Sequence, residues 1–256
     1  MKMLRCRVLA VVIAALPSLV RPQPPDISVS PAPSASAVET QRATPQRQAA
    51  EQSLRILASR PLLNTDPRSG SRILDIDDVR ALRDATIGYG FEVHVVDPKR
   101  LLDGGSIDAS LIRSGVWRFA ILLAGKPIGL MTVARIDGRW QMVEVGASTL
   151  AKDIADVVGG YADDRPAPQM RFIRSPQAVA DFIEIIPPPT RESASARGYV
   201  PLLSASEMID PAAASLPAAT TAKRAARTER EIIEALRTNV RRGMREPRFN
   251  RQESAP

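Results

Sequence analysis

His94 is the only histidine in the chain, and imidazole is the side chain best suited to move protons near neutral pH. Glu92 lies two residues earlier, so on a strand both side chains would share one face and the carboxylate could orient the ring. A hydrolase also needs a hydroxyl nucleophile, and no serine lies in a Gly-x-Ser-x-Gly context. We therefore interpret His94 as an ordinary strand residue and expect no catalytic residue.

A cluster of acids at Asp75, Asp77 and Asp78 resembles the start of a calcium loop. Such a loop requires glycine at its sixth position and glutamate at its twelfth, where this chain has Arg80 and Thr86. Helix capping explains the acids better. With one histidine and one cysteine, a zinc site is also disfavoured. We predict neither a metal site nor a cofactor.

The strongest local pattern runs from Trp117 to Val145, where Gly125-Lys126 and Asp137-Gly138 separate three strand-like segments. Pairing the segments through two tight turns sorts alternate side chains onto two faces. The first face is almost wholly apolar, which predicts a core. It carries Trp117, Phe119, Ile121, Leu123, Ile128, Leu130, Thr132, Ala134, Ile136, Val143 and Val145.

The second face of this meander mixes apolar and charged side chains around the small residues Ala120 and Gly129. An apolar patch with a charged rim is typical of a partner-binding surface. The alternative is that a helix covers this face. We predict a binding site there, formed by Trp140, Arg118, Arg135, Met131 and Glu144.

Helical spacing and strand patterns flank the meander. We expect helices over 75–87, 148–158 and 221–243, and a short helix over 49–59. Gly88 and Gly90 are expected to end the first of these helices. The helix over 221–243 has a narrow apolar stripe, formed by Ala226, Ile233, Leu236 and Val240. We expect strands over 91–96, 170–174, 180–186 and 199–203. This order predicts an α+β fold with a small, mostly antiparallel sheet, a three-strand meander plus flanking strands, helices packed on one face, and disordered tails. In outline it resembles small exported domains of the PepSY or cystatin-like kind.

The N-terminus has the layout of a secretory signal. Lys2, Arg5 and Arg7 precede a stretch without charge from Val8 to Val20. That stretch is shorter than the roughly 20 residues of a membrane span. No clean pair of small residues marks a cleavage site, so retention by an uncleaved N-terminal anchor stays an alternative. We expect an exported protein, periplasmic or secreted.

Composition changes divide the rest of the chain. The predicted divisions are 1–20 signal peptide, 21–50 disordered tether rich in Pro, Ser and Ala, 51–72 short helix and loop, 73–203 single α+β domain, 204–220 low-complexity linker, and 221–256 basic helix with a disordered tail.

The net charge of +7 could suggest a nucleic-acid partner. The positive excess lies in the two ends, however, because residues 61–216 hold 17 basic and 20 acidic side chains. We expect no nucleic-acid binding. The composition favours a non-catalytic binding protein of the cell envelope or extracellular space, whose partner would be a protein, a peptide or an envelope polymer.

Two other functions stay open. One is an exported hydrolase with a carboxylate-based or His94-based site. The other is an assembly factor that associates with membranes peripherally through the basic helix at 221–243.

Overall fold

One mixed, mostly antiparallel sheet of seven strands organises the chain, so the fold is α+β. The computed structural model describes residues 44–59, 73–188, 197–210 and 224–246. The strand order is β4-β3-β2-β1-β5-β6-β7. The sheet is therefore larger than the small sheet expected from the sequence. The predicted signal peptide at 1–20 lies outside the described residues, as does most of the predicted tether.

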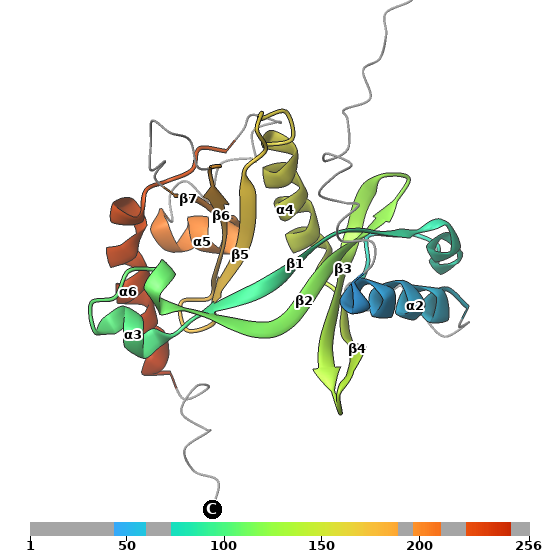
Figure 1. Ribbon diagram of the computed structural model, residues 1–256, viewed down its shortest axis with the longest axis horizontal. Coiled ribbons are helices and arrows are strands. Elements are labelled where there is room, and N and C mark those ends of the chain that lie inside the picture. Colours follow the sequence, from blue (N-terminus) through green and yellow to red (C-terminus); the bar gives the residue numbers. More distant parts are fainter. Residues whose placement is uncertain (1–43, 60–72, 189–196, 211–223, 247–256) are drawn as a thin grey trace, which may run out of the picture. The chain divides into compact units, whose positions relative to one another are not determined.

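The strands are numbered along the chain (Figure 1). They are β1 (Thr86–Val96), β2 (Leu111–Leu123), β3 (Lys126–Ile136), β4 (Arg139–Gly146), β5 (Gln169–Ser175), β6 (Ala180–Ile186) and β7 (Gly198–Pro201). All neighbours pair antiparallel except β1 and β5, which pair parallel from Val93 to Val95 with Phe172 to Arg174.

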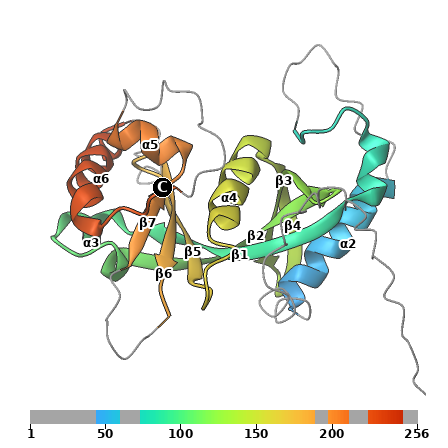
Figure 2. The same ribbon diagram turned by 90° about the horizontal axis from the view of Figure 1, so that it is seen from above.

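The helices are α2 (Pro45–Ser59), α3 (Pro98–Leu102), α4 (Ser148–Gly160), α5 (Leu203–Ile209) and α6 (Glu229–Met244), with 3-10 turns η2 (Val79–Asp84) and η3 (Asp108–Ser110). Helix α2 lies across the predicted division at residue 50. Helix α2 packs at one end of the sheet and α6 with α3 at the other (Figures 1 and 2).

Apolar side chains are buried on both faces of the sheet, so the expectation of helices on one face is wrong. On β5, Phe172 packs in a cluster with α4, whereas its neighbour Ile173 packs with α6. On β2, Ala120 belongs to the cluster of α4 and Phe119 to that of α2. Because neighbouring strand residues point to opposite faces, α4 covers one face, here called the α4 face. Helices α2 and α6 cover the opposite face.

The helix expected over 75–87 is replaced by the short η2 turn and by a longer β1. Asp78 caps the turn by accepting a hydrogen bond from the Arg80 amide. Gly88 and Gly90, which we expected to end the helix, lie inside β1. A Cβ at Gly90 would come within 2.3 Å of the Phe119 ring on β2. Glycine here allows close approach between two strands rather than stopping a helix.

The predicted register of β2 with β3 is wrong by one residue. Leu123 pairs with Lys126, so the two turn residues are Ala124 and Gly125. The pairing then shifts by one residue between Leu122 and Ile121. Phe119 consequently faces Met131, not Thr132. Beyond the irregularity, this shift of one residue moves the β3 side chains to the other face relative to β2. The Asp137-Gly138 turn is confirmed, but β4 carries a second irregularity between Met142 and Glu144.

Helix α6 begins with a capping box, in which the side chains of Thr228 and Glu231 each accept a hydrogen bond from the other residue's backbone amide. Its buried side is made by Ile232, Leu236, Val240 and Gly243. The segment before it adds an antiparallel bridge from Arg227 to Tyr199 on β7. The chain from 224 onward is therefore joined to the sheet by backbone hydrogen bonds as well as by apolar packing.

Candidate functional site

The structure does not bring the five predicted site residues together. Trp140 and Met131 pack in the apolar cluster with α2 on the opposite face. Arg135 is exposed and donates a hydrogen bond to the Gly138 carbonyl. Arg118 and Glu144 lie on the α4 face, where an Arg118 nitrogen is 3.6 Å from a Glu144 oxygen. The two irregularities of the meander cause this separation, because each one changes the face of the residues beyond it.

His94 lies on β1 and is half-buried. Its Nδ1 is 3.3 Å from the Glu92 carbonyl oxygen, and the Glu92 carboxylate is paired with Arg113 on β2 at 2.6 Å. Burial lowers the pKa of His94, and nearby Arg171 adds to this effect. Within the described ranges no serine or threonine hydroxyl is hydrogen-bonded to the ring. A backbone carbonyl therefore orients the His94 ring, and no hydroxyl nucleophile among the described residues is paired with it.

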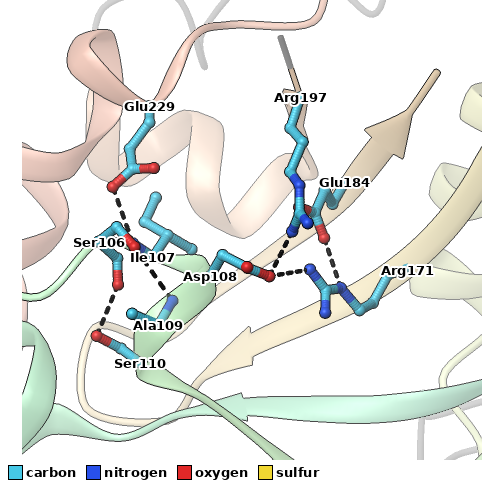
Figure 3. Close-up of polar contacts among 9 residues, drawn as sticks. All are labelled: Ser106, Ile107, Asp108, Ala109, Ser110, Arg171, Glu184, Arg197 and Glu229. Carbon is cyan, nitrogen blue, oxygen red and sulfur yellow. Dashed lines mark hydrogen bonds and ion pairs between the residues drawn. The ribbon is translucent and has the colours of Figure 1, made fainter. Parts of the chain in front are cut away.

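Four charged side chains meet at the end of the sheet near α6 (Figure 3). Arg171 on β5 binds Glu184 on β6 and Asp108 of η3, each at 2.5 Å. Arg197 also pairs with both acids. Burial acts to raise the pKa of Asp108, but the two guanidinium groups hold it below its usual value. Two acids matched by two bases form a closed network that cross-links the strands.

The network continues into α6 through Glu229. A carboxylate oxygen of Glu229 accepts a hydrogen bond from the Ile107 amide at 2.9 Å (Figure 3). Ser106 accepts another from the Ala109 amide. These bonds fix the loop before β2 against α6. We interpret this end of the molecule as structural.

A cavity of about 500 Å³ lies between α4 and the sheet. Such a volume falls within the roughly 300–1,000 Å³ of small-molecule sites. The cavity opens where β1 and β5 diverge, upstream of their short parallel pairing at Val93 and Phe172. Its lining comes from β1, α4, the loop after α4, β5 and β6. The lining residues are Tyr89, Gly90, Phe91, Ile154, Val158, Tyr161, Ala162, Ala167, Pro168, Gln169, Met170, Phe172 and Ile183.

Aromatic rings dominate the wall of this cavity on the sheet. Phe91 and Phe172 stack with their ring centroids 4.9 Å apart. The Tyr89 hydroxyl is buried and has no hydrogen-bond partner among the described residues. Burial raises the pKa of Tyr89, and the charge of Asp156 adds to this. The lining of the cavity is therefore suited to contact with apolar groups.

Two arginines lie over the Phe172 ring of the same aromatic stack. The guanidinium carbons of Arg118 and Arg174 are 6.0 and 5.9 Å from the centre of the Phe172 ring. Arg174 is held by both oxygens of Asp181, at 2.7 and 2.8 Å. Arg118 is only 8% exposed, and burial lowers its pKa, with the charge of Arg174 adding to this. Arg174 is therefore hydrogen-bonded to an acid, whereas the Nε and Nη1 of Arg118 have no hydrogen-bond partner among the described residues.

No family model, curated protein or solved structure matches this chain. Function has to be argued from the site alone.

The described segments hold neither a cluster of metal-binding side chains nor a helix that could span a membrane. No group of three or more metal-binding side chains occurs there. No helix in those segments combines the length and apolar character needed to cross a membrane. Asp75 pairs with Lys152 at 2.5 Å instead.

Sequence reasoning missed the cavity residues. Tyr89, Phe91 and Val93 alternate along β1, and Met170 and Phe172 alternate along β5. This alternation marks a core-facing side of each strand. It does not reveal that the two strands separate, and the cavity depends on that separation.

Proposed function

We propose that this chain is a non-catalytic binding protein that takes a small apolar ligand in the cavity beneath α4. The cavity itself carries the proposal, since it combines an apolar lining with stacked aromatic rings at one wall. Largely preformed apolar pockets with few polar groups are the usual form of small-molecule sites. The ligand site replaces the mixed meander face as the candidate binding surface.

Binding is favoured over catalysis by the arrangement of the polar groups. His94 contacts the backbone carbonyl of Glu92 on its own strand. The acids Asp108 and Glu184 are both paired with Arg171 and Arg197. None of them lines the cavity. A hydrolase would need a nucleophile and a base facing the same space.

Filling the cavity tests the proposal. Val158→Phe places a ring in the lining of α4 and is expected to weaken binding of decanol, a simple apolar probe, by tenfold or more. Gly159→Phe is the matched control, because a Cβ at Gly159 meets nothing within 4 Å and Gly159 does not line the cavity. Calorimetric titration of the full-length chain measures both. Equal binding by the two variants, or no binding by the unaltered chain, would refute the proposed function.

Export is a separate part of the proposal and rests on the N-terminal sequence. A reporter enzyme that works only outside the cytoplasm is expected to be active when it is fused behind residues 1–20. Ala14→Arg within the apolar stretch should abolish this activity, because a charge opposes entry into the membrane. A silent fusion with the unaltered segment would contradict export.

A further inference from the structure

Arg118 is a buried cation whose hydrogen-bonding capacity is unused. Its guanidinium donates no hydrogen bond to any described residue, and its Nε and Nη1 are shielded from solvent. Among the described residues Glu144 is the one acid in contact with Arg118, and it lies 3.6 Å away, which is too long for a hydrogen bond. Burying unsatisfied donors of a charged group costs free energy. A group that supplies acceptors to Arg118 would recover that cost.

The location of Arg118 connects it with the cavity. In β2 it pairs across to Phe91 on one side and Thr132 on the other, so its side chain lies on the α4 face. Phe172 contributes to the cavity lining and also lies beneath the Arg118 guanidinium. Arg118 is not part of the cavity lining itself, but the Phe172 ring is shared between that lining and the surroundings of the Arg118 guanidinium.

The neighbouring charges limit which anion fits. Both oxygens of Asp181 already bind Arg174, so of the two arginines only Arg118 is left for a ligand. Glu144 and Asp181 place negative charge nearby. A dianion such as a phosphate ester would be repelled by these acids, whereas a carboxylate matches the single charge of Arg118.

We propose that the ligand of the cavity is a monocarboxylic amphiphile, with its apolar part beneath α4 and its carboxylate on Arg118. This inference rests on the proposed function. Glu144 is 60% exposed at its side chain, so water can solvate it when the ligand carboxylate takes its place beside Arg118. Thr132 donates a hydrogen bond to Glu144 and can retain it during that exchange.

Decanoate and decanol, which share the same alkyl chain, separate the two proposals when titrated calorimetrically into the full-length chain. We expect decanoate to bind at least about tenfold more tightly, as a charge-assisted hydrogen bond would give. Arg118→Met should remove this preference while decanol binding stays unchanged. Arg135→Met, which alters an exposed arginine on the opposite face, is the matched control and should keep the preference.

Glu144→Gln provides an independent arm that leaves Arg118 in place. Removing the competing carboxylate should strengthen decanoate binding severalfold and leave decanol unaffected. If the unaltered chain binds decanol as tightly as decanoate, the carboxylate assignment is wrong and the apolar site stands. If neither probe binds, both proposals are wrong. The assignment is also overturned if a folded Arg118→Met variant still prefers decanoate over decanol. If that variant does not fold, the change in decanoate binding by Glu144→Gln decides.

Discussion

Gly243→Ala is expected to destabilise the protein by about 3 kcal/mol, the upper end of the usual cost of overpacking. Gly243 lies on the buried side of α6, and an added Cβ would come within 1.8 Å of the Gln177 carbonyl oxygen and 2.7 Å of its carbon. Both atoms belong to the backbone of the turn between β5 and β6, so no side-chain rotation relieves the clash. The helix has to move away from the sheet.

Gly159→Ala is the control for this result. It makes the same substitution in α4, where the new methyl group meets nothing within 4 Å. Alanine stabilises a helix interior relative to glycine by roughly 0.5–1 kcal/mol. Urea denaturation should therefore shift the two midpoints in opposite directions. Equal midpoints for the two variants would show that α6 is not held against that turn.

Glu184→Ala is expected to cost about 3–5 kcal/mol, as removal of one partner from a buried ion pair does. Glu184 is fully buried and contacts both Arg171 and Arg197. Its loss leaves two guanidinium groups sharing Asp108 alone. The chain around β5 and β6 would then hold an excess positive charge next to the apolar cluster of α6.

Asp108→Ala is the matched comparison within the same network. Asp108 contacts the same two arginines, but its side chain is 42% exposed, so water can replace it. We expect a loss well below that of Glu184→Ala. Chemical denaturation at neutral pH measures both variants. Similar losses would mean that burial does not set the strength of this network.

Patterns confined to one segment predicted the elements best. The strand over 180–186 is confirmed with both bounds, since its apolar residues end at three prolines and follow a turn. The stripe of α6 was predicted through Leu236 and Val240, and both are buried. The predicted stripe included Ile233, whereas Ile232 is the fully buried residue. A local periodicity fixes the type of an element more firmly than its rotation.

Features that depend on a distant partner were not predictable from the sequence. The sequence predicts a helix end at Gly90. The contact that requires a glycine there, with the Phe119 ring, lies 29 positions further along the chain and leaves no local pattern. The meander faces were assigned by assuming regular ladders, and one irregularity in each pairing changed them. Of the five predicted site residues, Arg118 remains a candidate, and its new neighbours on β5 could not be inferred from the meander.

The parallel pairing of β1 with β5 also bears on how the chain folds. Strands β1 to β4 form consecutive hairpins, as do β5 to β7, so each set can assemble from contacts near in sequence. Within the sheet the two sets pair at three positions, between segments almost eighty residues apart. Contacts of long sequence separation form late because loop closure costs entropy first. We expect the two hairpin sets to act as separate folding units, and the cavity beneath α4 to form only in the last step, when they join.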